Sequence, residues 1–328
     1  MARILVTGGA GYIGSHTAKA LAAAGHEPVL YDSLINGHAW AALDAPLIEA
    51  DIRDEAALNQ AMADHQIEAV MHFAALIEVG HSVRQPALFH EVNFGGSATL
   101  LKAMQAAGVK HIVFSSSCAV YGEPMVERLD EHHVKQPINP YGASKLAVEE
   151  QLEAADKAGA LSYMALRYFN AAGADADGQL GEAHDPETHV IPRAILAALG
   201  AAPMFQINGT DYATPDGTAV RDYVHVSDLA TAHLAAIEHL LSGGQSAALN
   251  LGSGQGYSVK QVVDAVAEAL GRPVPHQIGP RREGDSPALV ADPSAAKSLL
   301  KWAPTQSDLT TIVQSAASWH QKQLAAAD

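Results

Sequence analysis

TGGAGYIG, residues 7–14, follows a β-branched run at Ile4–Thr7 and opens an alanine-rich helical pattern. It contains the spacing G-x-x-G-x-x-G, at Gly8, Gly11 and Gly14. Glycines so placed allow a tight turn, a close approach of backbone to a pyrophosphate, and close packing of a helix on a strand. The amino terminus of the helix also presents free N–H groups and a positive dipole end to phosphates. Strand, glycine turn and helix together predict a dinucleotide-binding βαβ unit.

The alternation of strand and helix continues through the first half of the chain. The β-branched runs are short and almost wholly apolar, which is typical of strands covered by helices on both faces. This pattern predicts an α/β fold with a doubly wound parallel sheet of the Rossmann type. The expected strands are Ile4–Thr7, Pro28–Tyr31, Leu47–Ala50, Ala69–Phe73 and Ile112–Ser115, with helices at Ile13–Ala24 and Ala56–Asp64.

The pattern loosens after about residue 170 and predicts a smaller, mixed α/β substrate domain. Ala171–Thr188 is rich in Gly, Asp and Ala and indicates a long loop, and long loops in compact domains are often functional. We expect a dinucleotide-binding domain at 1–175, joined by parts of 215–250, and a substrate domain at 176–328. The expected elements are a helix after Pro192, a strand at Phe205–Ile207, a helix at Asp228–Leu241, a strand at Leu249–Leu251 and a helix at Ser258–Leu270 with Ser258 as its N-cap.

Charge and composition argue against several classes of partner. The formal charge of −16 disfavours nucleic acid, whose binders present a basic surface, and also anionic membranes. Cys118 is the only cysteine, so no intrachain disulfide can form, which fits a reducing compartment. The first apolar run ends at Thr7, too early for a signal peptide, and no stretch approaches the ~18 uncharged apolar residues of a membrane helix. We therefore expect a soluble, cytoplasmic protein.

Asp32 ends the second expected strand, 18 residues after Gly14. A carboxylate about 20 residues beyond the glycine turn takes the ribose hydroxyls of a dinucleotide, and it would repel the 2′-phosphate of NADP. NAD is therefore the expected cofactor; the alternative is a structural turn followed by a surface aspartate. The residues expected to meet the rest of the cofactor are Asp51 and Ile52 at the adenine, and Phe73, Ala74 and Ala75 along its central part.

The segment YGASK, residues 141–145, carries the predicted chemistry. On a helix, Tyr141 and Lys145 stand one turn apart on the same face. A free tyrosine has a pKa near ~10, and a nearby ammonium together with a positive nicotinamide favours the phenolate. Ser115 and Ser117 end the fifth expected strand, at the sheet edge where ligands bind in open α/β sheets. Ser117, Tyr141 and Lys145 are therefore the expected catalytic residues.

These motifs resemble the extended short-chain dehydrogenase/reductase family, and within it the UDP-glucose 4-epimerases. The resemblance runs almost from end to end of the chain. It rests on TGGAGYIGSH at 7–16, HFAA at 72–75, FSSSCAVYG at 114–122, PYGASK at 140–145, RYFNAAGA at 167–174, DGTAVRDYVHVSDLA at 216–230, NLGSG at 250–254 and RREGD at 281–285.

The resemblance implies an enzyme that holds NAD and inverts C4 of a sugar carried on UDP, through a 4-keto sugar and with no net oxidation. It places Ser117 and Tyr141 at the sugar O4, and Lys145 at the nicotinamide ribose. The cofactor residues implied are Gly8, Gly11, Tyr12, Ile13, Gly14, Asn36, Asn93, Ser115 and Phe169. The substrate residues implied are Asn170, His189, Gln206, Arg221, Arg282, Asp285 and Leu289, with the arginines at the pyrophosphate.

The resemblance further implies a homodimer through the helices around 91–107 and 142–157, and gives Asp222, Tyr223 and His225 structural roles. Two departures stand out. Ile77 replaces a lysine of some members, which removes one cofactor contact. Leu289 stands where enzymes restricted to glucose and galactose often have tyrosine, so N-acetylated UDP-hexosamines become possible substrates.

Three other functions compete with this interpretation. A 4,6-dehydratase resembles the chain but has an acidic pair where Ser117-Cys118-Ala119 stands. A pentose 4-epimerase would share the same site. An NAD-sensing regulatory protein would not need Ser117, Tyr141 and Lys145.

The dense group His184, Asp185, Glu187 and His189 invites a metal interpretation. Its match to the substrate loop of the family is a simpler account, and no metal is predicted. Cys118, next to Ser117, is expected to be buried packing rather than a nucleophile.

Overall fold

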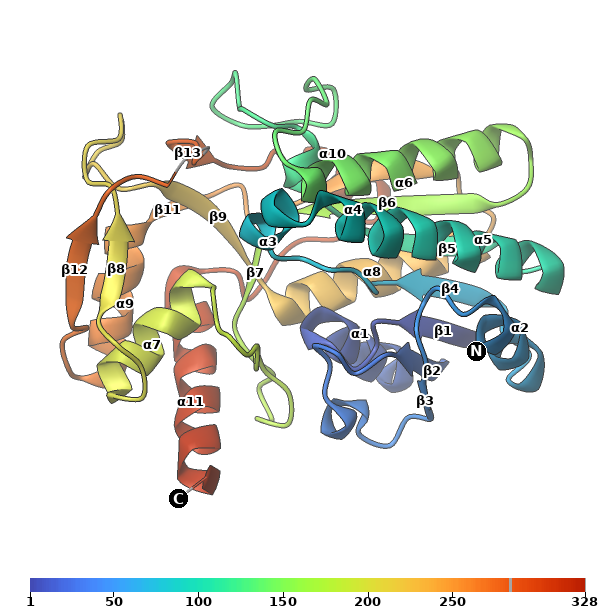
Figure 1. The fold of residues 1–328 in the computed structure, drawn as a ribbon, viewed down its shortest axis with the longest axis horizontal. Helices are drawn as coiled ribbons and strands as arrows, with labels where there is room; N and C mark the ends of the chain where they lie inside the picture. Colours follow the sequence, from blue (N-terminus) through green and yellow to red (C-terminus); the bar gives the residue numbers. More distant parts are fainter. Residues whose placement is uncertain (283–284, 328) are drawn as a thin grey trace.

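The computed structural model describes residues 1–282 and 285–327, and a seven-stranded parallel sheet forms its centre (Figure 1). The strand order β3-β2-β1-β4-β5-β6-β10 runs outward in both directions from the β1/β4 pair, which is the doubly wound arrangement. The fold class predicted from the sequence is therefore confirmed. The strands are β1 (Arg3–Thr7), β2 (Glu27–Asp32), β3 (Leu47–Glu49), β4 (Ala69–His72), β5 (His111–Ser117), β6 (Ser162–Tyr168) and β10 (Ala247–Leu251).

Helices cover both faces of this sheet. On one face α1 (Tyr12–Ala23) packs against α8 (Val226–Leu241), over side chains such as Ile4 and Val6. Leu5 points to the opposite face, into a second core that it shares with side chains of the adjacent strands, such as Val29 and Val70. Because successive side chains of a strand alternate between two covered faces, most strand positions are apolar. The helices of the second face are α2 (Glu55–Asp64), α5 (Gly96–Ala107) and α6 (Pro140–Lys157).

A smaller group of elements lies beside the sheet, at the left of Figure 1. Three helices, α7 (Val190–Leu199), α9 (Val259–Leu270) and α11 (Leu309–Ala327), enclose a third core. They accompany a parallel pair of strands and a small mixed sheet, as the sequence predicted for this part of the fold. The strands are β8 (Phe205–Asn208) with β12 (His276–Gly279), and β9 (Val220–His225) with β7 (Asn170–Ala172), β11 (Gly256–Ser258) and β13 (Ala288–Leu289).

Short elements complete the description. They are α3 (Val79–Arg84), α4 (Pro86–Phe89), a π-helical turn (His90–Gly95), two 3₁₀ turns (Ala39–Ala42 and Cys118–Val120) and α10 (Ser294–Leu299). None of the helices within residues 1–282 and 285–327 has the length and apolar character that a membrane crossing requires.

Several predicted elements differ in detail. The helix expected after Pro192 begins at Val190, because a proline is tolerated in the first turn of a helix. The expected loop 171–188 gives its first two residues to β7 and is otherwise irregular. Leu249–Leu251 is part of β10, an edge strand of the main sheet. The chain therefore returns to this sheet after it has formed part of the smaller group of elements. The boundary between residues 175 and 176 stays a prediction.

Ser258 caps α9 as predicted. Its hydroxyl accepts a hydrogen bond from the Gln261 backbone N–H at 3.1 Å, and the Gln261 side chain accepts one from the Ser258 N–H at 2.8 Å. This reciprocal capping box satisfies two N–H groups that the helix itself leaves unpaired.

Candidate active site

The glycine turn between β1 and α1 is packed too closely to accept side chains. A Cβ on Gly8 would lie 2.5 Å from the Ala74 backbone nitrogen, and a Cβ on Gly14 would lie 2.2 Å from the Gly8 oxygen. Gly11, the N-cap of α1, provides no side-chain cap for the first turn. A bare, closely packed helix start of this kind fits the pyrophosphate of a dinucleotide.

Asp32 ends β2 and turns back toward the glycine turn. Its carboxylate accepts hydrogen bonds from the backbone N–H groups of Ala10 at 3.0 Å and Leu34 at 2.9 Å. Burial raises the pKa of this carboxyl, and the two hydrogen bonds work in the opposite direction. Tyr12 and Asn36 line a small pocket beside the same turn. The arrangement suits a carboxylate that receives the ribose hydroxyls.

The adenine residues predicted from sequence have a neighbour that the sequence did not reveal. Asp51 forms an ion pair with Arg53 at 2.6 Å, and Arg53 also pairs with Glu91 at 2.5 Å. Ile52 is buried and packs against Gly96, where a Cβ would come within 2.5 Å of it. The Asp51 carboxylate is thus held by a guanidinium rather than free to turn toward a base.

Asn93 clamps the turn after β4 to helix α6. Its side-chain oxygen accepts a hydrogen bond from the Leu76 N–H at 2.8 Å. Its amide nitrogen donates to the Leu76 carbonyl and to the Ser144 hydroxyl, both at 3.0 Å. Phe73 and Ala74, which follow β4, lie directly over Gly8, so the predicted middle portion of the cofactor site is assembled from three chain segments.

Ser117, Tyr141 and Lys145 meet at the carboxyl end of β5. Asn139 caps α6 by accepting a hydrogen bond from the Gly142 N–H at 2.8 Å, which places Tyr141 in the first turn. The Lys145 ammonium donates to the Ser115 carbonyl at 2.8 Å and lies 5.8 Å from the centre of the Tyr141 ring. All three side chains are buried. Ser115 also contacts Tyr168 through its hydroxyl, at 2.6 Å.

Burial dominates the electrostatics of this trio. Burial raises the pKa of the Tyr141 phenol well above its ordinary value, and the adjacent Ser117 hydroxyl offsets only part of the rise. Burial also lowers the pKa of Lys145 to about 7, against the attraction of Glu149. The expectation that Lys145 and a positive nicotinamide together favour the phenolate stays a prediction, and the stabilisation must offset the effect of burial on the Tyr141 pKa.

A buried ion pair that the sequence did not reveal supports this helix. Glu149, one turn beyond Lys145 on the same face of α6, accepts hydrogen bonds from the Arg167 guanidinium at 2.8 and 2.6 Å. It also accepts one from the Ser116 hydroxyl at 2.6 Å. Arg167 donates in turn to the Tyr121 hydroxyl at 2.9 Å. The sequence signal that could have indicated Glu149 is its spacing, since it continues the four-residue interval between Tyr141 and Lys145 along the helix.

Three of the predicted substrate residues are linked to one another, and two of them, Arg221 and Leu289, lie near Cys118, the residue after Ser117. Arg221 forms an ion pair with Asp285 at 3.2 Å and donates to the Ser286 carbonyl at 2.9 Å. Leu289 pairs with Arg221 across β13 and β9, and it packs into the cluster that contains Cys118 and Phe169.

Burial raises the pKa of the Cys118 thiol to about 12, which accords with a packing role for this cysteine.

The other predicted substrate residues lie further along the same side. Gln206 and Arg282 both lie beside Asn208, at the end of β8. The Asn170 amide donates to the Asp222 carbonyl at 2.9 Å, and His189 pairs with Glu182 at 2.6 Å. The RREGD motif is described only at 281, 282 and 285, since residues 283–284 lie outside the described ranges.

The Asp222 carboxylate is held by backbone N–H groups. It accepts hydrogen bonds from the N–H groups of Ser253, Gly254 and Ala291, at 2.9, 3.0 and 3.1 Å. Tyr223 is buried in the third core, and the His225 imidazole accepts a hydrogen bond from the Ser227 N–H at the start of α8. These contacts support the structural roles predicted for the three residues.

Comparison with known proteins places this site in a family. Residues 4–252 match the NAD dependent epimerase/dehydratase family. The chain belongs to that family. A UDP-glucose 4-epimerase of Rhizobium leguminosarum bv. trifolii is 53% identical over 319 residues, which are 97% of each chain.

Two solved structures of the family extend the comparison. A UDP-glucose 4-epimerase from Brucella ovis, in complex with NAD, is 48% identical, with a TM-score of 0.95 over 97% of this chain and 98% of its own. A UDP-Glc/GlcNAc 4-epimerase from Campylobacter jejuni is 37% identical, with a TM-score of 0.85 over 98% of this chain and 100% of its own. The match to the family therefore covers the smaller group of elements as well as the Rossmann sheet.

Glu149→Gln should destabilise the fold by about 3–5 kcal/mol, because it leaves the buried Arg167 guanidinium without a counter-charge. The matched control is Glu153→Gln on the same helix, which breaks the exposed pair with Lys157 and should cost less than about 0.5 kcal/mol. Urea unfolding of the two variants measures both values. Equal losses in the two variants would contradict a supporting role for the buried pair.

Proposed function

We propose that the protein interconverts UDP-glucose and UDP-galactose by inverting C4 of the sugar, with NAD held throughout the cycle. The observation that carries the proposal is the meeting of Ser117, Tyr141 and Lys145 at the end of β5, beside Leu289 and Arg221. The names of the relatives agree with this chemistry. The chain carries a net charge of −16, so an anionic nucleotide sugar needs a local group of arginines at its binding site.

Tyr141 is the proposed acid–base group. It removes the proton of the sugar 4-hydroxyl, while the Ser117 hydroxyl hydrogen-bonds to O4 and keeps it in line. The chemistry that bound NAD supplies is reversible hydride uptake from C4. After the keto sugar has turned about its link to the phosphates, Tyr141 returns the proton. Burial of the trio excludes water, so that the ketone is retained.

Lys145 is the proposed partner of the nicotinamide ribose. Within the chain its ammonium is held by the Ser115 carbonyl, and burial depresses its pKa to about 7. Since burial raises the pKa of Tyr141, the positive charges of Lys145 and of the nicotinamide would have to offset that burial to stabilise the phenolate. The phenol is thereby suited to act as a base when the oxidised cofactor is present and as an acid when it is reduced.

The proposed binding residues fall into two groups, those that contact NAD and those that contact the UDP-sugar. We assign the pyrophosphate of NAD to the turn at Gly8, Gly11, Tyr12, Ile13 and Gly14. The remaining cofactor contacts proposed are Asp32, Asn36, Asp51, Ile52, Phe73, Ala74, Ala75, Asn93, Ser115 and Phe169. The UDP-sugar contacts proposed are Asn170, His189, Gln206, Arg221, Arg282, Asp285 and Leu289. A cytoplasmic homodimer through α5 and α6 completes the proposal.

The purified protein should convert UDP-galactose to UDP-glucose with no added nucleotide, because the cofactor is regenerated in each cycle. A coupled assay that oxidises UDP-glucose measures this, and acid extraction quantifies the bound NAD. Activity strictly proportional to added NADP would contradict both the retained cofactor and the role of Asp32. Loss of water from the sugar, with no epimer formed, would identify a 4,6-dehydratase.

Tyr141→Phe should lower turnover by about 10²-fold or more, as expected when a general acid–base group is removed. NAD should stay bound, since the phenol oxygen is a minor cofactor contact. Turnover and NAD content are measured on the same preparation, which separates a chemical defect from a loss of cofactor. A variant with more than about a third of wild-type activity would exclude Tyr141 as the base.

UDP-N-acetylgalactosamine should also be epimerised, because Leu289 is shorter than the tyrosine of restricted enzymes and has no hydroxyl. Leu289 packs against the same buried cluster as Cys118, which follows Ser117 in the chain, and Phe169 belongs to that cluster. Leu289→Tyr should abolish the N-acetyl reaction and spare that of UDP-galactose. If the wild type gives no N-acetyl product at high enzyme concentration, neighbouring side chains have refilled the space and another residue sets the specificity.

A further inference from the structure

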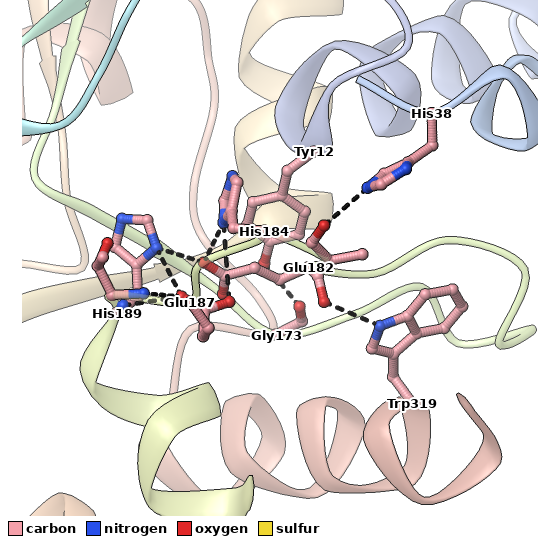
Figure 2. Close-up of polar contacts among 10 residues, drawn as sticks. Tyr12, His38, Gly173, Glu182, His184, Glu187, His189 and Trp319 are labelled. Carbon is pink, nitrogen blue, oxygen red and sulfur yellow. Dashed lines mark hydrogen bonds and ion pairs between the residues drawn. The ribbon is translucent and has the colours of Figure 1, made fainter. Parts of the chain in front are cut away.

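Two glutamates and two histidines converge in the irregular segment between β7 and α7 (Figure 2). The residues are Glu182, His184, Glu187 and His189, and one ligand atom from each lies within 4.8 Å of all the others. Glu182 is buried, and His184 and Glu187 are partly buried. Four groups that can each bind a metal therefore face one small volume.

Both imidazoles turn the same nitrogen toward the carboxylates. Nδ1 of His189 lies 2.6 Å from one Glu182 oxygen, and Nδ1 of His184 lies 3.2 Å from that same oxygen. Glu187 faces the two rings at 3.3 and 3.8 Å. Tetrahedral bonds of about 2.0–2.2 Å keep ligand atoms roughly 3.4 Å apart. The observed spacings lie around that value and need only small side-chain movements.

The charge of the group suits a cation. In the described part of the chain, the ion pairs of Glu182 and Glu187 are all with His184 and His189. The two imidazole rings stand with centroids 5.1 Å apart, on the same side as both carboxylates. One divalent ion among these groups would balance the two carboxylate charges.

The groups around the cluster fix its shape. One Glu187 oxygen accepts hydrogen bonds from the backbone N–H groups of Thr188 at 2.7 Å and His189 at 2.8 Å. Trp319 on α11 donates to the Glu182 carbonyl at 3.0 Å, and the edge-on Tyr12 ring lies 6.2 Å from the His184 ring. Metal ligands in proteins are oriented by supporting contacts of this kind.

We propose that Glu182, His184, Glu187 and His189 bind one divalent transition-metal ion, with zinc as the best match. Two imidazoles and two carboxylates suit zinc better than calcium or magnesium, which prefer oxygen ligands alone. The proposal revises the expectation of no metal, because the structure brings in Glu182, which the sequence cluster had not included. It takes His189 from the UDP-sugar contacts proposed above and otherwise does not depend on the proposed enzymatic function.

The ion would brace the segment that leads into α7. All four proposed ligands lie within residues 182–189, and His189 is the N-cap of α7. Tyr12, in the first turn of α1, lies beside this segment through its ring contact with His184. The expected effect of a metal is therefore on the stability of the 182–189 segment.

The intact protein, with any bound nucleotide retained, is treated with EDTA, dialysed, and titrated with zinc. One equivalent should bind and raise the melting temperature. Cobalt should bind in its place and give visible d–d absorption bands. His184→Asn should weaken zinc binding by at least about tenfold and remove these bands. The matched control is His132→Asn, which removes an exposed histidine outside the cluster and should bind metal as the wild type does.

Weak binding to surface histidines is excluded if only the His184 variant loses the metal. Equal zinc binding by both variants would overturn the proposal. So would a wild type that takes up no zinc or cobalt, which would leave the cluster as a group of protonated imidazoles and carboxylates. Should the His184 variant not fold, Glu187→Gln provides the second test, and the cobalt spectrum of the wild type decides on its own whether these ligands hold a metal.

Discussion

The carboxylate of Glu149 and the guanidinium of Arg167 hold helix α6 against strands β5 and β6. Three hydrogen bonds end on this carboxylate, two from Arg167 and one from Ser116. Tyr141 and Lys145 project from the same face of the helix, so their position over the end of β5 depends on how α6 is seated. A buried ion pair of this kind stabilises the helix only while both partners are present, because loss of either one leaves an uncompensated charge in the core.

A related constraint acts on several carboxylates near the candidate site. Asp51 is held by Arg53, Asp285 by Arg221, and the Glu182 and Glu187 pair by two histidines. Each of these carboxylates has a basic side chain beside it, although the overall charge of the chain is −16. Asp32 differs, since it is satisfied by backbone N–H groups alone. That arrangement leaves acceptor capacity for hydroxyl groups of a ligand.

Much of the fold could be predicted because its signals are local. The glycine spacing, the apolar strands and the N-cap at Ser258 each depend on residues within about one turn of one another. Strands β6 and β9 were missed for a physical reason. Arg167 lies within β6, and Arg221 and Asp222 lie within β9. Each of these charges is paired through contacts with distant segments, so the sequence pattern there looks too polar for a buried strand.

The sequence by itself determined the doubly wound sheet, the dinucleotide turn and the identity of the Ser117, Tyr141 and Lys145 trio. These follow from backbone sterics and from side-chain period, which neighbouring residues set. Only the tertiary structure decided the partners of the buried charges, because those partners lie far along the chain: Arg167 for Glu149, Asp285 for Arg221, and Tyr12 beside His184. It also decided how strongly burial shifts the pKa values of Tyr141 and Lys145, since desolvation depends on everything packed around a group and not on its neighbours in sequence.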